Sequence, residues 1–216
     1  MKEFAVIGLG RFGVSLAERL LDLGHNVLAI DVSAEKVQDA SEIVDHAVVA
    51  DATDEDDLRA LGMRNFDVVV VAIGENIQAS ILCTVLLKEL GVKTVITKAV
   101  SDLHGKVLER VGADKVVFPE RDMGQKLAYS LSASNVIDYM VLSNEYGIEE
   151  MRIPKKLCGI TLEKLKLRAK YGLNIIGIKK ANGAYIHSVG ADTIFEINDV
   201  AIVAGSYKGL RIMEEE

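Results

Sequence analysis

Hydrophobic residues in the first 118 positions alternate between short Val- and Ile-rich runs and longer segments where apolar residues recur every three or four positions. The short runs lack polar alternation, which is typical of strands in a parallel sheet covered on both faces. We expect such strands at Glu3–Gly8, Asn26–Asp31, Asp45–Asp51, Phe66–Gly74, Lys93–Lys98 and Asp114–Phe118. The longer segments predict helices at Arg11–Leu23, Ala34–Ala40, Glu55–Leu61, Asn76–Leu90 and Leu103–Val111.

Glycines mark the ends of these helices. One glycine follows a helical segment and precedes the next strand in four cases, at Gly24, Gly62, Gly91 and Gly112. Glycine is favoured there because the residue after a helix often adopts a left-handed conformation. Six strands interleaved with helices predict an α/β fold, a doubly wound parallel sheet of the Rossmann type.

The pattern changes after Pro119. A helix is predicted at Arg121–Ser134, with an apolar stripe at Met123, Leu127 and Leu131. Shorter strands follow at Asp138–Leu142, Ile148–Ile153, Leu173–Lys179, Tyr185–Val189 and Val200–Ala204, with one helix at Leu162–Ala169. We therefore expect two domains, 1–135 and 136–216, the second a small α+β lobe.

Composition narrows the class of protein. With 50% hydrophobic residues and a mean hydropathy of +0.23, a disordered or fibrous chain is not expected. A formal net charge of −7 does not suit nucleic-acid binding, and two cysteines cannot form a disulfide framework. The chain starts without a signal-peptide pattern, and its purest apolar run, Val68–Ile73, is far shorter than the roughly 20 residues that cross a bilayer. A soluble cytoplasmic protein is expected.

A glycine-rich motif carries the strongest chemical signal. The sequence G-x-G-x-x-G at Gly8, Gly10 and Gly13 follows a predicted strand, opens a predicted helix, and is followed by Asp31 at the end of the next strand. In this context the glycines allow a tight turn, close approach of a phosphate and close helix packing, while the acid binds ribose hydroxyls. The sequence therefore predicts a nucleotide site that disfavours a 2′-phosphate.

The kind of nucleotide is less constrained. Asp31 suits NAD, ATP and ADP alike, whereas Arg11 adds a positive charge where a terminal di- or triphosphate would gain most, unless it simply faces solvent. Further site residues are expected near the carboxyl ends of the strands and beside the motif: Arg11, Phe12, Val32, Lys36, Asp51, Ala52, Thr53, Ala72, Ile73, Gly74 and Lys98.

Catalytic groups are not apparent beside this site. The four histidines form no spaced motif, Cys83 lies in an apolar run typical of a core thiol, and nothing near Cys158 suggests activation. We therefore predict no catalytic residues. A cofactor site without a reaction indicates nucleotide sensing, with a small NAD-linked oxidoreductase as the alternative.

Longer stretches resemble one family. The segments that carry the resemblance are 4–13, 72–80, 112–114, 119–124, 168–172 and 192–205. Together they are similar to the RCK (or KTN) regulatory subunits of the bacterial Ktr and Trk potassium uptake systems, most of all to the KtrA-like branch. The resemblance covers essentially the whole chain.

The resemblance implies a cytosolic gating ring. In this family the Rossmann lobes pair, the pairs form an octameric ring, and the ring docks on an integral-membrane potassium-translocating subunit of the KtrB or TrkH type. ATP and ADP compete for the glycine-rich site, and the position of Arg11 is expected to meet the γ-phosphate. The helix at Arg121–Ser134 would be the crossover helix of the family, whose apolar stripe pairs subunits, although by its pattern the stripe could equally be an intramolecular core face. A Trk-type sensor of NAD or NADH remains the alternative within the family.

Two further sites are implied by the resemblance. Glu120 matches a carboxylate that binds Mg²⁺ or Ca²⁺ between subunits, although an acid after Pro119 is also favourable at a helix N-terminus. The stretch 155–180 holds eight basic residues and one acidic residue, which fits either a solvated face or an anion site. Relatives that bind cyclic di-AMP have matching positions there, and commonly a proline near the position of Val189, which this chain lacks. The matching positions are Arg168, Asn174, Ile175 and Ile176.

Overall fold

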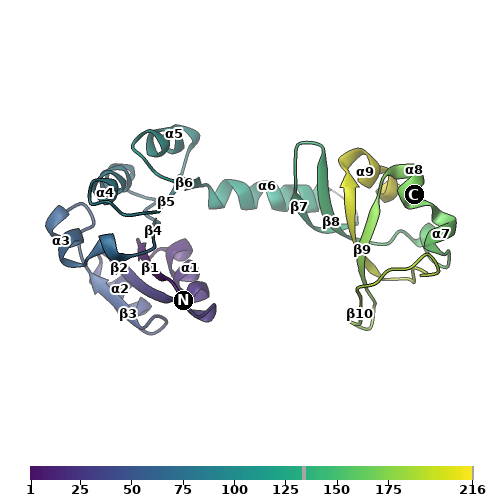
Figure 1. Ribbon diagram of the computed structural model, residues 1–216, viewed down its shortest axis with the longest axis horizontal. Coiled ribbons are helices and arrows are strands. Elements are labelled where there is room, and N and C mark those ends of the chain that lie inside the picture. Colours follow the sequence, from purple (N-terminus) through teal and green to yellow (C-terminus); the bar gives the residue numbers. More distant parts are fainter. Residues whose placement is uncertain (133–134, 216) are drawn as a thin grey trace. The chain divides into compact units, whose positions relative to one another are not determined.

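The computed structural model describes residues 1–132 and 135–215, which form two compact units, Met1–Arg121 and Asp122–Glu216 (Figure 1). The division lies within helix α6 (Pro119–Ser132), whereas the sequence placed the domain boundary after residue 135. Most of this helix belongs to the second unit because its side chains bond there: Lys126 Nζ lies 2.8 Å from a carboxylate oxygen of Asp138. The predicted end of the crossover helix, 133–134, lies outside the described residues.

The first unit is built on a six-stranded parallel sheet with the strand order β3-β2-β1-β4-β5-β6. The strands are β1 (Glu3–Ile7), β2 (Asn26–Asp31), β3 (His46–Val49), β4 (Val68–Val71), β5 (Val95–Lys98) and β6 (Lys115–Val117). This order is that of the Rossmann fold, in which the direction of winding reverses between β1 and β4. The predicted fold class is confirmed.

Apolar side chains project from both faces of the sheet. Alternate residues of β1 enter different cores: Ala5 and Ile7 join a cluster with Leu58 and Leu87, whereas Val6 joins a cluster with Ala17. Helices cover these faces, α1 (Arg11–Asp22) and α2 (Ala34–Ala40) on one side, and α3 (Glu55–Ala60) and α4 (Ile77–Glu89) on the other. Uninterrupted Val and Ile runs are therefore required, because no face of a central strand meets water.

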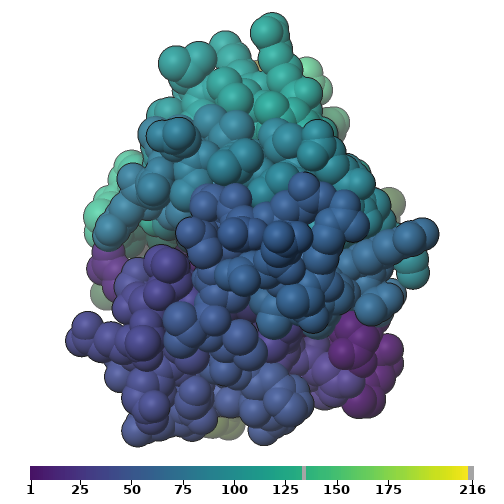
Figure 2. Space-filling view, turned by 90° about the vertical axis from the view of Figure 1, so that its left-hand side faces the viewer, coloured from purple at the N-terminus to yellow at the C-terminus, as the bar shows by residue number. Residues whose placement is uncertain are grey.

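Turns between helices and strands follow the predicted glycines. Gly24, Gly62, Gly91 and Gly112 all have positive φ, between 67° and 103°, as a left-handed residue after a helix requires. The remaining elements of this unit are the short 3-10 helix Met63–Asn65 and α5 (Asp102–Arg110). Residues of the α2 to α4 region, coloured blue, form one continuous surface in the space-filling view (Figure 2).

The second unit contains a five-stranded antiparallel sheet with the order β10-β9-β11-β8-β7. Its strands are β7 (Val136–Val141), β8 (Tyr146–Arg152), β9 (Asn174–Lys179), β10 (Tyr185–Ile186) and β11 (Val200–Ser206). One core cluster fills this unit, with Met151, Phe195, Ala201, Leu210 and Met213 all fully buried. The predicted α+β lobe is thus a sheet with short helices around a single core.

Several elements of the second unit differ from expectation. The single predicted helix is two, α7 (Leu162–Leu165) and α8 (Leu167–Tyr171), because Lys166 between them adopts a left-handed conformation with φ of 51°. Strand β10 ends three residues earlier than predicted. The terminal helix α9 (Tyr207–Glu215) was not predicted, nor was the 3-10 helix Lys155–Leu157. Among the described residues, no helix has the length and apolar character needed to span a bilayer.

Candidate functional site

A cavity of about 530 Å³ lies in the first unit, at the carboxyl ends of its strands. It is placed over the junction of β1 and β4, where open α/β sheets bind ligands. Fourteen of the fifteen nucleotide-site residues predicted from the sequence line it, together with Glu120. They are Gly8, Gly10, Arg11, Phe12, Asp31, Val32, Lys36, Asp51, Ala52, Thr53, Ala72, Ile73, Gly74 and Lys98. Gly13 is the exception.

The three motif glycines have different structural roles. Gly8 has φ of +99°, and a Cβ built there would lie 2.9 Å from the backbone nitrogen of Ile73. A Cβ on Gly13 would overlap the carbonyl oxygen of Gly8, so Gly13 lets α1 pack against the turn from behind the cavity. A Cβ on Gly10 would meet nothing within 4 Å and would project into open space. Gly8 and Gly13 are therefore needed for the fold, whereas the fold does not need a glycine at position 10.

The N-terminus of α1 has no cap. Gly10 occupies the N-cap position, no side chain among the described residues bonds to the first-turn N–H groups, and the first turn contains no acid. In contrast, α2 to α5 each have a capping side chain, supplied by Ser33, Asp54, Asn76 and Ser101. The first N–H groups of α1 and the positive end of its dipole thus face the cavity and can bind an anion.

Asp31 is buried at the end of β2 and is 8% exposed. Its Oδ2 accepts a hydrogen bond from the backbone N–H of Leu9 at 2.7 Å, and its Oδ1 accepts one from Ser33 at 2.9 Å. Lys36 lies 3.8 Å away. The carboxylate therefore holds the glycine-rich turn in place, in addition to offering its remaining lone pairs to a ribose, a structural role that the motif alone did not indicate.

Cationic side chains flank the cavity. Lys98, at the end of β5, forms an ion pair with Glu120 at 2.5 Å, and its Nζ lies 5.8 Å from the centre of the Phe12 ring. The hydrogen bond from Lys98 is the main reason that the pKa of Glu120 lies below its usual value, with a smaller contribution from Arg11. Arg11 is exposed and has no ion-pair partner within 4 Å in the described chain. Arg11 is therefore free to meet an added anion.

Residues that the sequence reasoning missed come from the segments next to the predicted ones. They are Ile7, Ala50, Glu75, Asn76, Ala79 and Val100. Glu75 and Asn76 follow Gly74 directly, so their position after a strand end could have indicated them. Asp51, one of the predicted residues, is held in place by Thr53: its Oδ1 accepts two hydrogen bonds from that residue, and these bonds lower the pKa of Asp51.

Metal ligands are sparse in a single copy of the chain. In the parts that the structure describes, no group of three or more His, Cys, Asp or Glu side chains could hold a metal ion. The role of Glu120 as a metal ligand thus remains a prediction, and it needs further ligands from outside a single copy of the chain.

The Cys83 thiol is not activated. Burial raises the pKa of this thiol to about 12, as expected for an inert thiol in the core.

The other predicted residues lie in the second unit. Arg168 is exposed on α8, and Asn174 to Ile176 form the start of β9, where Ile176 is 47% exposed and Ile175 packs against the core. They do not line this cavity, and their effector role remains a prediction. The crossover-helix stripe is uncovered, with Met123, Leu127 and Leu131 all 57–77% exposed, so it is not an intramolecular core face.

Both units match known protein families. The TrkA-N domain family matches residues 4–119, and the TrkA-C domain family matches residues 148–215. The Ktr system potassium uptake protein C of Bacillus subtilis (strain 168) is 48% identical over 214 residues, covering 99% of this chain and 96% of the relative. The Ktr system potassium uptake protein A of Vibrio alginolyticus is 38% identical over 204 residues, covering 94% of this chain and 92% of the relative.

Solved structures show the same architecture. The crystal structure of the GsuK RCK domain matches 99% of this chain and 47% of its own length, with a TM-score of 0.71 at 18% identity. A Rossmann-type unit followed by a small antiparallel unit defines the class of RCK proteins. Within that class, the chain belongs to the family of regulatory subunits of the bacterial Ktr and Trk potassium uptake systems.

Proposed function

We propose that this chain is a cytoplasmic gating subunit that binds ATP or ADP at the α1 cavity and thereby regulates potassium flux through an integral-membrane partner. The observation that carries the proposal is the uncapped N-terminus of α1, which opens into a cavity that also contains Asp31. Unpaired N–H groups suit phosphates, and a buried carboxylate at the end of β2 suits a ribose. The family supports a regulatory role in potassium uptake.

Arg11 supports a distinction between ATP and ADP. The charge of Lys98 is already partly balanced by Glu120, whereas Arg11 has no ion pair in the described chain. A third phosphate would extend from the α1 N-terminus and bring further negative charge near this guanidinium. Such a charge-assisted contact is worth about 1.5–3 kcal/mol.

Arg11→Ala is expected to weaken ATP binding by roughly ten- to a hundredfold and ADP binding clearly less. Isothermal titration calorimetry of the full chain with ATP, ADP, NAD and NADH gives this comparison. Arg19→Ala is the matched control, because Arg19 lies on the same helix but pairs with Asp22 on its exposed face. Equal losses for ATP and ADP would show that Arg11 does not contact the γ-phosphate.

The same titration tests the alternative ligand. If NAD or NADH binds more tightly than ATP and ADP, the chain is a dinucleotide sensor instead. Enzymatic hydride transfer is a separate alternative, and incubation with NADH and small ketones is expected to give no protein-dependent loss of absorbance. Turnover that disappears in Gly10→Val would contradict the sensor proposal.

We propose that the exposed stripe of Met123, Leu127 and Leu131 pairs two copies of the chain, as the family resemblance implies, and that pairs assemble further into a ring. The support is the exposure of all three side chains in a row along α6. Contiguous apolar surface of this kind commonly marks an interface.

Glu120 is proposed to bind Mg²⁺ or Ca²⁺ only in the paired, ATP-bound state. One carboxylate is too few, because these cations take six or more oxygen ligands, whereas two copies, phosphate oxygens and water could supply them. The cation must also displace Lys98 from Glu120. We expect the cation to raise the melting temperature and the sedimentation coefficient of the ATP-bound wild type, and to have no such effect on Glu120→Gln. An equal effect on both proteins would contradict the assignment.

A further inference from the structure

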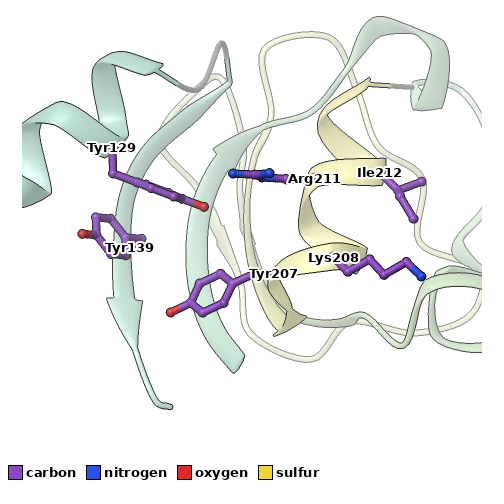
Figure 3. Close-up of a pocket in the computed structure, with 6 residues that line it drawn as sticks. All are labelled: Tyr129, Tyr139, Tyr207, Lys208, Arg211 and Ile212. Atoms are coloured by element: carbon purple, nitrogen blue, oxygen red, sulfur yellow. The ribbon is translucent and has the colours of Figure 1, made fainter. Parts of the chain in front are cut away.

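A second cavity, of about 650 Å³, lies within the second unit. Its volume falls in the usual range of small-molecule sites, about 300–1,000 Å³. It is formed where α6, β7 and α9 meet, and none of its residues was predicted as a site residue. The lining residues are Tyr129, Tyr139, Tyr207, Lys208, Arg211 and Ile212 (Figure 3).

Two of the three tyrosines form a fixed wall. The Tyr129 hydroxyl donates a hydrogen bond of 2.5 Å to Oε1 of Glu149, a fully buried residue of β8. The Tyr129 and Tyr139 rings lie with their centres 4.3 Å apart. Because the hydrogen bond and the ring contact hold Tyr129 from two directions, this wall is preformed rather than assembled around a ligand.

The third tyrosine is positioned by a glycine. A Cβ at Gly147 would lie 2.9 Å from the Cε1 atom of Tyr207, so the absence of a side chain there lets the Tyr207 ring lie against β8. Tyr207 is the first residue of α9, and Arg211 lies one helical turn further on. The aromatic ring and the guanidinium therefore face the same side of α9.

Polar groups around the cavity are short of partners. Among the side chains of residues 1–132 and 135–213, Lys208 and Arg211 have no ion-pair partner, and the hydroxyls of Tyr139 and Tyr207 make no hydrogen bond. The one nearby buried acid, Glu149, has a pKa raised by burial, which favours its neutral form. Available donors thus outnumber acceptors, and an anion is the complementary partner.

The side chains of Lys208 and Arg211 point in different directions. In Figure 3, Arg211 extends from α9 toward Tyr129, whereas the side chain of Lys208 extends away from the three tyrosines. Guanidinium groups combine a planar charge with five donors, which suits a carboxylate or phosphate next to an aromatic face.

We propose that this cavity binds a small anion with a planar aromatic ring, which contacts the tyrosine faces while its acidic group pairs with Arg211. Aromatic carboxylates and nucleoside monophosphates share this chemistry. The site is separate from the α1 cavity in residues and in unit, so the proposal goes beyond the proposed function and does not depend on it.

The test uses the full chain and two anionic probes, 2-naphthoate and AMP, with 2-naphthamide and adenosine as neutral counterparts. Binding is measured by calorimetry for the wild type, Arg211→Gln, Tyr207→Leu and Gly10→Val, with Lys179→Gln as the matched control, because Lys179 is an exposed cation that does not line the cavity. Circular dichroism and melting temperature check that each variant is folded. We expect at least one anion to bind with Kd below about 1 mM, and the probe that binds identifies the source of the ligand.

Arg211→Gln is expected to weaken that binding about tenfold or more, Tyr207→Leu about tenfold, and Lys179→Gln less than about twofold. Several results would overturn the proposal: no anion binds in this range, the neutral counterparts bind equally well, or Arg211→Gln behaves like Lys179→Gln. Binding that is lost in Gly10→Val but kept in Arg211→Gln belongs to the α1 cavity and also overturns it. The proposal is also overturned if Arg211→Gln changes the sedimentation coefficient, because that result would show that another copy of the chain covers the cavity.

Discussion

Gly10→Val is expected to reduce nucleotide affinity by at least about a hundredfold while changing the free energy of unfolding by less than about 1 kcal/mol. Gly10 has φ of −79° and ψ of −178°, which a β-branched residue adopts readily, and a Cβ there meets no atom within 4 Å. The added methyl groups instead fill the space next to the first N–H groups of α1. A phosphate could then no longer approach those groups.

In contrast to Gly10→Val, Gly13→Ala in the same motif is expected to affect mainly the stability of the fold. Its Cβ would overlap the carbonyl oxygen of Gly8, so the turn or the helix must move, and we expect destabilisation of about 3 kcal/mol. Chemical denaturation and calorimetric titration of both variants separate the two roles. If Gly10→Val binds ATP, ADP and NAD as the wild type does, the cavity is not the nucleotide site.

Lys180→Met is expected to destabilise the second unit by about 3–5 kcal/mol, because it leaves a buried charge unpaired. Lys180 Nζ lies 2.8 Å from Oδ2 of Asp199, a residue that is 0% exposed, and 3.2 Å from the exposed Glu196. The other carboxylate oxygen of Asp199, Oδ1, has no hydrogen-bond partner within the part of the chain that the structure describes. Urea denaturation monitored by circular dichroism measures the loss.

Lys179→Met is the matched control, since Lys179 is exposed and has no ion pair in the described chain, and we expect less than about 0.5 kcal/mol for it. Burial by itself would lower the pKa of Lys180, but the hydrogen bonds to Asp199 and Glu196 outweigh it, and the pKa is raised. The stabilisation is therefore complete below the unfolded pKa of lysine and is lost only as the pH rises through the higher folded value. Equal stability of the two variants at pH 7 would contradict this role.

The first unit was predictable because its signals are local. A strand buried on both faces shows as an uninterrupted apolar run, a left-handed residue after a helix shows as a glycine, and strand ends place the cavity residues. The second role of Asp31 was not predictable, because its bond to Leu9 joins residues 22 positions apart through backbone geometry. Residues such as Ala79 line the cavity only through the packing of α4.

The second unit was harder to predict because its boundaries depend on tertiary contacts. The left-handed conformation of Lys166 splits a helix at a residue type that carries no such signal. Helix α9 follows β11 without any linker, and the buried apolar side chains of its described part, Leu210 and Met213, are too few to define a period. The tyrosine-lined cavity combines residues from positions 129, 139 and 207, which no sequence spacing connects.

The position of β1 has a consequence for hydrogen exchange. Phe4 pairs with Val27 of β2 on one side and with Val68 of β4 on the other, so β1 joins two halves of the sheet that are distant in sequence. The cavity lies over this junction, with Asp31 from one half and Ala72 from the other. Opening of either half would release a ligand bound there. Bound nucleotide should therefore slow amide exchange in both halves together, including strands that the nucleotide never touches.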